Sequence, residues 1–218
     1  MQFGIGLPNL SYVDPTETLM RLAHAAQELA FDAIWVSDHV FIPYEYEPNY
    51  PYSATGRLGL SATDYIFDPL TTLAFLAGQV PTPRLGISVL IMPYRNPIIT
   101  AKMLVTLDVL SGGRVILGVG VGWMPEEFAA LGASYEHRGG VTDEYIQIFR
   151  ELCTADKPAF EGKHYQISNA GASTAPGRGS AADAVGRQLH ALVRLGVGDS
   201  PSTPRPHCML PDVRSTTP

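Results

Sequence analysis

The stretch AIWVSDHVF, Ala33 to Phe41, places four residues suited to a buried strand directly before a serine, an aspartate and a histidine. A short, continuously apolar run is typical of a strand that is covered on both faces, as in a parallel sheet. Asp38 and His39 then lie where this strand is expected to end. The stretch therefore indicates either a polar turn or a functional site at the carboxyl end of a strand.

The sequence on either side of this strand alternates between strand and helix patterns. The predicted strands are residues 3–7, 33–36, 85–91 and 114–120. Three helices are predicted to begin at Asp14, Asp68 and Asn96, because each of these residues precedes a proline, which is a helix-start signal. Two more helices, at 125–131 and 142–153, and a hairpin at 160–167 are expected after the last of these strands. Strand–helix alternation predicts a parallel sheet covered by helices, either a closed barrel or an open doubly wound sheet.

The glycines argue against a dinucleotide fold. The pair Gly4 and Gly6 lacks the third glycine of the Rossmann fingerprint. Gly118, Gly120 and Gly122 alternate along a predicted strand, so they share one face and leave room there for something flat. Tight packing of strands explains the same spacing equally well.

Composition favours a protein that binds or converts small molecules in a reducing compartment. The chain has 218 residues, 45% apolar content and a formal net charge of -6, with no Lys/Arg cluster. Nucleic acids and anionic membranes need a concentrated positive field, so we expect neither as a partner. Cys153 and Cys208 are too few for a disulfide framework and lack zinc-site spacing, and the sequence shows no export signal. A cytoplasmic protein without a bound metal is expected.

The chain changes character near residue 170. All 20 aromatic residues, all three lysines and every glutamate precede this point. The last 49 residues are rich in Ala, Gly, Pro, Ser, Thr and Arg, with one short helical candidate at 181–195. Such a segment buries little apolar surface. We therefore predict two parts, a folded part at 1–169 and a divergent, poorly ordered, low-complexity tail at 170–218, for which out-of-frame reading of a GC-rich gene is one hypothesis.

Several motifs in the first part occur together and in a fixed order. They are FGIGLP, FDAIWVSDH, SVLIMPYRNP, GGRVILGVGVGW followed by EEF, then HRG, DEY and FEGKHY. In this order they resemble the N-terminal part of the luciferase-like monooxygenases, especially the branch that uses the deazaflavin coenzyme F420. The resemblance implies a (β/α)8 TIM-type barrel whose cofactor lies across the carboxyl ends of the strands. Only about four of the eight strands are recognised, so the barrel is expected to be truncated.

The resemblance also implies which residues form the site. Asp38 and His39 would lie beside the flavin or deazaflavin ring as catalytic residues, with a neighbouring carboxylate fixing the tautomer of the imidazole. Ser88-Val89 would form a non-proline cis peptide behind the ring. The residues expected to contact the cofactor are Ser88, Val89, Leu90, Met92, Gly120 and Gly122. A turn cap and a half-buried histidine remain the alternative interpretation of Asp38 and His39.

Other matching positions allow two interpretations each. Met92, Tyr94 and Asn96 would line the rim of the site or belong to an exposed loop. Glu127, Arg138 and Glu144 match family positions, yet they could form only a surface ion pair, which contributes little to stability. Trp123 stands where the sugar-phosphate dehydrogenase branch has an acidic residue, so that substrate class is not expected. The long segment 41–67, rich in Tyr and Pro, is expected to be a substrate lid.

Two classes of function follow from this sequence. The first is an oxidoreductase that transfers hydride between F420 and a small organic substrate, with an FMN-dependent monooxygenase as the alternative within the same fold. The second is a catalytically incompetent fragment or pairing module, because the later strands and their phosphate-binding segment are not recognised. In either case the resemblance implies a homodimer.

Overall fold

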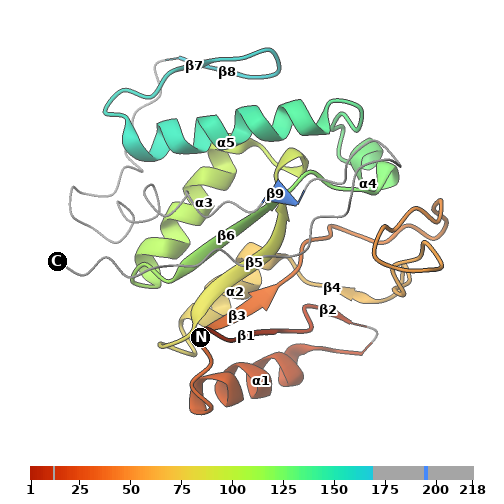
Figure 1. Ribbon diagram of the computed structural model, residues 1–218, viewed down its shortest axis with the longest axis vertical. Coiled ribbons are helices and arrows are strands. Elements are labelled where there is room, and N and C mark those ends of the chain that lie inside the picture. Colours follow the sequence, from red (N-terminus) through yellow and green to blue (C-terminus); the bar gives the residue numbers. More distant parts are fainter. Residues whose placement is uncertain (12, 169–193, 196–218) are drawn as a thin grey trace.

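The computed structural model of the chain describes residues 1–11, 13–168 and 194–195. Its main sheet has five parallel strands in the order β1-β3-β5-β6-β9 (Figure 1). They are β1 (Gly4–Gly6), β3 (Ala33–Val36), β5 (Arg84–Ile91), β6 (Val115–Gly120) and β9 (Arg194–Leu195). A doubly wound sheet reverses its strand order at a switch point, whereas a (β/α) barrel adds strands in chain order. The order within this sheet confirms an α/β fold of the barrel type.

Five α-helices and one short 3-10 helix are present among the described residues. They are α1 (Thr16–Glu28), α2 (Pro69–Ala77), η1 (Met92–Tyr94), α3 (Pro97–Leu110), α4 (Pro125–Ala130) and α5 (Arg138–Thr154). The Asp68 side chain accepts from Thr71 N at 2.8 Å, and the Asn96 side chain caps α3 in the same way, which confirms both predicted helix starts. The last helix begins at Arg138, four residues before the predicted start at 142.

The core lies between the sheet and its helices. α2 contacts β3 and β5, and α3 contacts β6 and α5, so these helices cover one face of the sheet (Figure 1). Ile34, Leu85 and Ile87 on the strands and Leu73 and Leu76 on α2 are fully buried in this cluster. Ile91, Tyr94 and Phe128 form a second, smaller cluster at the carboxyl ends of the strands. The larger cluster joins the sheet to its helices, and the smaller one packs among the loops that follow the strands.

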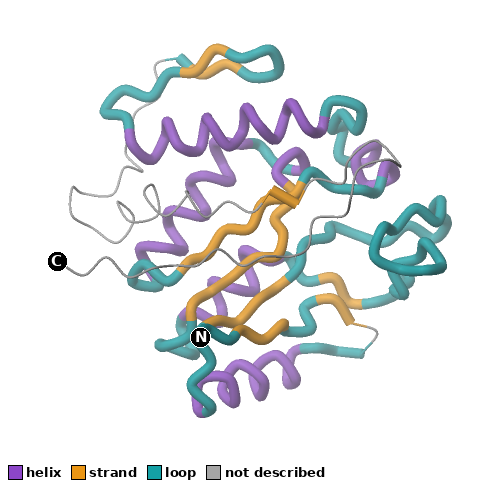
Figure 2. The backbone as a smooth tube through the Cα atoms, viewed as in Figure 1, coloured by secondary structure: helices purple, strands orange, loops and turns teal. Residues whose placement is uncertain are grey.

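Two short antiparallel pairs complete the described part. β7 (Phe160–Glu161) pairs with β8 (Gln166–Ile167), which confirms the predicted hairpin. β2 (Leu10–Ser11) pairs with β4 (Tyr65–Ile66), a pairing that the sequence analysis did not predict. This second pair closes the base of residues 41–64, a long loop segment that forms a lobe beside α4 (Figure 2). We refer to residues 41–64 as the lid loop.

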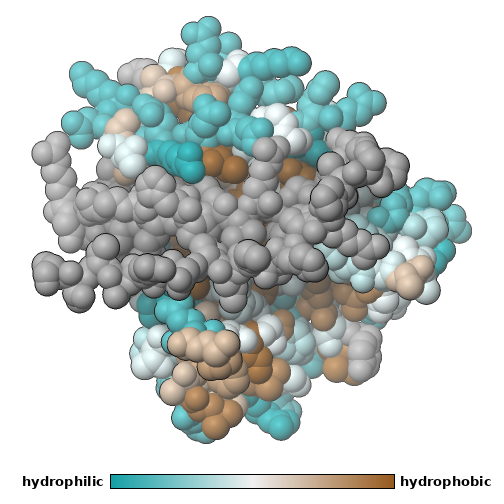
Figure 3. All heavy atoms as spheres, in the orientation of Figure 1, coloured by the Kyte–Doolittle hydropathy of each residue, from teal (hydrophilic) through white to brown (hydrophobic). Residues whose placement is uncertain are grey.

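The C-terminal segment is only partly described. Arg194 and Leu195 pair with Val119 and Gly120, which adds a short fifth strand to the four that were expected and places the end of the helical candidate 181–195 in a strand. Residues 169–193 and 196–218 lie outside the described residues, so the boundary near 170 stays a prediction. No helix of the described part combines the length and the apolarity needed to cross a bilayer. Apolar side chains gather on the lower part of the face in Figure 3, where β1 and α1 lie.

Candidate functional site

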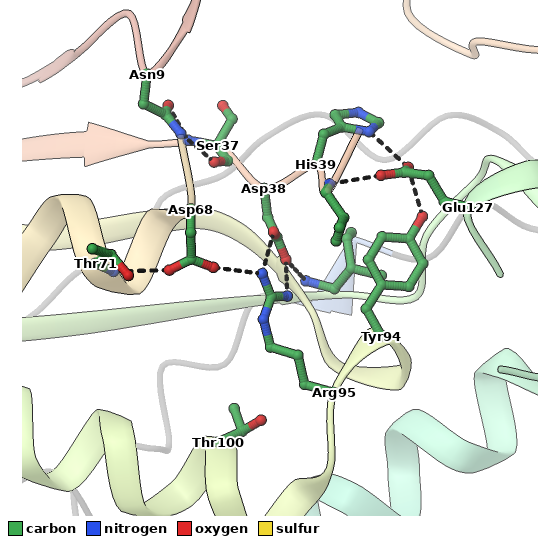
Figure 4. Close-up of polar contacts among 12 residues, drawn as sticks. Asn9, Ser37, Asp38, His39, Asp68, Thr71, Tyr94, Arg95, Thr100 and Glu127 are labelled. Atoms are coloured by element: carbon green, nitrogen blue, oxygen red, sulfur yellow. Dashed lines mark hydrogen bonds and ion pairs between the residues drawn. The ribbon is translucent and has the colours of Figure 1, made fainter. Parts of the chain in front are cut away.

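Polar residues gather where three neighbouring strands end. Asp38 and His39 follow β3, Tyr94 and Arg95 follow β5, and Glu127 lies in α4, which follows β6 (Figure 4). Because parallel strands end at the same edge of a sheet, residues up to 89 positions apart meet here. Two separate hydrogen-bond networks result, one centred on Asp38 and the other on Glu127.

Asp38 binds the loop that follows β5. Its carboxylate, with a side chain 0% exposed, accepts two bonds from the Arg95 guanidinium at 2.6 and 2.8 Å and one from Ile91 N at 2.8 Å. Arg95 also donates to Asp68 Oδ2 at 3.0 Å and so ties the start of α2 to the end of β3. Burial raises the pKa of the Asp38 carboxyl, while the bonds from Arg95 oppose that shift. Both oxygens of Asp38 are therefore occupied by groups that hold the strand ends together.

Glu127 is the carboxylate that contacts His39. It is fully buried, and its Oε2 accepts from His39 Nδ1 at 2.8 Å and from the Tyr94 hydroxyl at 2.9 Å. Its Oε1 accepts from Val40 N at 2.7 Å and, more weakly, from Phe41 N at 3.4 Å. The expectation that Glu127 takes part in a surface ion pair is wrong. The neighbouring carboxylate expected beside the imidazole is thus Glu127, whereas Asp38 faces Arg95.

The buried phenol of Tyr94 supports this carboxylate. Burial and the neighbouring Glu127 charge raise the pKa of the Tyr94 hydroxyl, so the phenol stays protonated and donates a hydrogen bond to the Glu127 carboxylate. The ring of Phe128 packs against the Tyr94 ring with centroids 4.8 Å apart. Tyr94 is thus a buried hydrogen-bond donor, in contrast to the exposed loop residue that was the alternative interpretation.

His39 presents one nitrogen with no hydrogen-bond partner within the described ranges. Because the Glu127 carboxylate can only accept, Nδ1 carries a proton in this arrangement. The other ring nitrogen, Nε2, makes no hydrogen bond to a described residue. The ring is 91% buried, and its edge meets the Trp123 ring with centroids 5.9 Å apart. An imidazole held in this way can accept a proton at Nε2 and return it.

The strand bulge beside this site involves two residues expected to contact a cofactor. The Ser88-Val89 peptide is cis, as the resemblance implied, and the β5–β6 register shifts between Ile87 and Leu90. Ser88 is exposed and Val89 is half-buried, whereas Leu90 and Met92 are buried in the main core. Ser88 and Val89 therefore remain open to a ligand. Contacts to Leu90 or Met92 would have to involve backbone atoms.

The alternating glycines make room for protein side chains. A Cβ on Gly120 would collide with the side chain of Val89, and one on Gly122 would lie 2.7 Å from Phe128 Cε2. Gly122 also has a φ of 82°, which favours glycine. Packing therefore explains the spacing of these glycines, and the space that we expected for a flat ligand is filled on this face. Cofactor contact at Gly120 and Gly122 stays a prediction.

The remaining matched positions serve local structure. Besides capping α3, Asn96 donates from Nδ2 to the Tyr165 hydroxyl at 2.9 Å. Arg138 stacks over the Tyr135 ring at 4.0 Å. Glu144 accepts from three consecutive backbone N–H groups of the β7–β8 hairpin, the first being Lys163 N at 2.8 Å. Slight burial raises the pKa of Glu144, but these bonds outweigh it and hold that pKa below its ordinary value.

The lid loop packs against Trp123 beside the site. Tyr46 and Tyr50 place their ring centroids 6.1 and 5.1 Å from that of Trp123, and Glu47 N donates to Glu126 Oε1 at 3.2 Å. A hollow of about 440 Å³ lies between the loop and α4, lined by Tyr44, Glu45, Tyr46, Glu47, Arg57 and Glu126. The lid assignment stays a prediction, but the loop does lie next to the residue that contacts His39.

The donor set fits the ring of a flavin or deazaflavin better than its charged tail. His39 Nε2 after the end of β3 and the exposed Ser88 at the bulge of β5 offer polar groups to a redox-active ring. Arg95, the cation at the same strand ends, is engaged by Asp38 and Asp68. Among the described residues, no group of three or more His, Cys, Asp or Glu side chains is placed to hold a metal ion.

Comparison with known proteins places this geometry in a family. Residues 1–193 match the luciferase-like monooxygenase family. An F420-dependent glucose-6-phosphate dehydrogenase of Amycolatopsis mediterranei is 33% identical over 156 residues, covering 70% of this chain and 42% of that protein. Uncharacterised mycobacterial relatives, from Mycobacterium bovis and Mycobacterium tuberculosis, are 32% identical over 71% of this chain and 54% of their own length. The chain thus spans about half the length of these curated relatives.

Solved structures show the same relation. The monooxygenase RslO1 from Streptomyces bottropensis superimposes with a TM-score of 0.62 at 26% identity, covering 81% of this chain and 52% of that one. The oxygenating constituent of a Pseudomonas putida Baeyer–Villiger monooxygenase in complex with FMN shares the fold, with a TM-score of 0.59, at 18% identity over 78% of this chain and 44% of that one. The chain belongs to the luciferase-like monooxygenase family.

Proposed function

We propose that this chain carries the ring-side half of an oxidoreductase site that transfers hydride between coenzyme F420 and a small organic substrate. The observation that carries the proposal is His39, whose Nδ1 is held by Glu127 at 2.8 Å while Nε2 is left without a described partner at the strand ends. An F420-dependent relative supports this cofactor. FMN is the alternative, supported by the monooxygenase neighbour that contains it.

The chemistry assigned to the chain's own residues is proton transfer. When bound, the cofactor ring would supply or accept the hydride. His39 Nε2 would take a proton from a substrate hydroxyl or return one to a carbonyl oxygen, because Glu127 keeps the opposite nitrogen protonated. Glu127 also offsets the positive charge that His39 gains in that step. Asp38 would act through Arg95 and Ile91 N, by holding the end of β5 beside Ser88-Val89.

A binding titration tests this function. Purified chain should bind F420 more tightly than FMN, with fluorescence of each cofactor as the signal. Tighter binding of FMN would reverse the order of the two cofactors. His39→Ala should lower turnover more than cofactor affinity, since the imidazole is assigned to proton transfer; unchanged turnover would remove His39 from the mechanism.

A pairing module is the second candidate, and a specific surface favours it. Ile99, Met103 and Leu110 on α3 are 61%, 40% and 76% exposed, and their spacing of four and seven residues places them on one helix face. Such a face suits a second copy of the chain or of a longer relative. Mass in solution by light scattering should therefore show a homodimer that Met103→Glu dissociates. A dimer that binds neither F420 nor FMN would favour this function over the enzyme.

A further inference from the structure

The two oxygens of Glu127 serve two different parts of the site. Oε2 accepts from His39 Nδ1 and the Tyr94 hydroxyl, and Oε1 accepts from Val40 N and Phe41 N at the entrance of the lid loop. A carboxylate offers about four acceptor positions, so this one is saturated. It is also fully buried, which makes each lost bond costly, because water cannot replace the missing partner.

We propose that Glu127 is a positioning residue that sets the tautomer of His39 and, through its other oxygen, anchors the lid loop. The consequence for turnover rests on the proposed function. The two structural effects do not, because tautomer and loop opening can be measured without any cofactor.

The tautomer of His39 in a Glu127 variant depends on which of the bonded groups can act either as donor or as acceptor. Backbone N–H groups can only donate, so a glutamine at position 127 must keep its amide oxygen on Val40 N. Its NH₂ group then faces His39 Nδ1 and the Tyr94 oxygen, both of which can become acceptors. Glu127→Gln should therefore move the His39 proton from Nδ1 to Nε2 and leave the loop entrance bound. Tyr94→Phe removes one donor to Oε2 but no acceptor, so it should keep the native tautomer.

The loop anchor is one of several that converge on the segment from Trp123 to Glu127. Trp123 contacts Tyr46 and Tyr50, and Glu126 accepts from Glu47 N in an exposed bond. The bonds to Val40 and Phe41 differ from these contacts, since they are part-buried and end on the carboxylate that also contacts His39. Glu127→Ala removes the contact with His39 and the bonds to the loop entrance at Val40 and Phe41 together. Glu126→Ala removes only the exposed bond from Glu47 N.

Nitrogen NMR of histidine-labelled full-length chain at pH 8 tests the tautomer. The His39 signals are assigned by their loss in His39→Gln. The wild type and Tyr94→Phe should show a protonated Nδ1 and an unprotonated Nε2, and Glu127→Gln should show the reverse. An unchanged tautomer in Glu127→Gln, or an Nε2-protonated wild type, would overturn the proposal.

Limited trypsin digestion tests the loop anchor, because Arg57 is exposed within the lid loop. Cleavage after Arg57 is measured relative to cleavage after the exposed Arg150 of α5, which reports opening elsewhere. Losing the charge-assisted bond to Val40 N should raise this ratio about tenfold or more in Glu127→Ala. Glu127→Gln should show the same cleavage ratio as the wild type. An equal rise of this ratio in Glu126→Ala and Glu127→Ala would refute the loop anchor. If Glu127→Ala does not fold, the His39 tautomer in Glu127→Gln decides the proposal alone.

Discussion

Replacing Arg95 should strongly lower the stability of the described domain at neutral pH. The Asp38 side chain is 0% exposed, and Arg95 supplies two of its three hydrogen bonds, at 2.6 and 2.8 Å. Arg95→Met leaves that carboxylate buried without a cation, which costs about 3–5 kcal/mol. The bond to Asp68, whose side chain is 39% exposed, adds little. Against a typical total of about 5–15 kcal/mol, this loss removes a large share of the free energy of unfolding.

The pH dependence of Arg95→Met gives the sharpest check. Burial raises the pKa of Asp38 in the wild type, and the variant loses the cation that opposes this shift. A group with a raised folded-state pKa contributes stability below its unfolded pKa of about 3.9, and this is lost as pH rises through the folded value. The deficit of Arg95→Met should therefore shrink on acidification.

Urea unfolding followed by circular dichroism at pH 7.5 and at a mildly acidic pH measures this deficit. Adding Asp38→Asn to Arg95→Met should recover about 2 kcal/mol at pH 7.5, since the orphaned charge is gone. Arg57→Met, which changes an exposed arginine, is the control. A deficit below about 1 kcal/mol at pH 7.5, or no recovery in the double variant, would refute the reasoning.

Three further predictions concern stability and reactivity. The Arg114 guanidinium donates four hydrogen bonds to the backbone carbonyls of Ser111, Val80, Pro83 and Ala77. Arg114→Lys should therefore lower the free energy of unfolding, measured in urea, by about 2–4 kcal/mol. A loss near zero would contradict the bridging role of Arg114. Gly120→Ala should lower the free energy of unfolding by about 1–3 kcal/mol, because the added Cβ would collide with the Val89 side chain. Gly6→Ala should lower it less, because a Cβ there meets open space. Equal losses in the two variants would argue against the packing account. Burial raises the pKa of the Cys153 thiol to about 12, so peptide mass analysis should find Cys153 unlabelled by maleimide at pH 8 until urea unfolds the chain.

Local signals in the sequence account for most of the fold. Asp68-Pro69 and Asn96-Pro97 open helices whose caps are visible in the structure, and Gly112 and Gly113, with φ of 72° and 82°, follow the end of α3 at Leu110. These features depend on residues within one turn of each other, so one sequence suffices to predict them. The β2–β4 pair joins two-residue segments 55 positions apart in the chain, and no local pattern marks it.

The candidate site was predicted in part. His39 and Asp38 were identified at the end of the strand, but their pairing was not. Asp38 faces Arg95 and the next residue, His39, faces Glu127, so the two neighbours in the sequence belong to different hydrogen-bond networks (Figure 4). Glu127 lies 88 residues from His39, in the first turn of α4, where an acid is favourable near any helix start. Only the tertiary arrangement separates that general preference from a specific role.

The most direct test of the central claim is the ring nitrogen spectrum of His39 during a titration of the full chain with F420. His39 Nε2 is the polar atom that we assign to the reaction, and it has no partner among the described residues. Saturable addition of F420 should shift the His39 signals and leave those of His24 on α1 unchanged. Saturable binding that leaves the His39 signals unmoved would contradict the account.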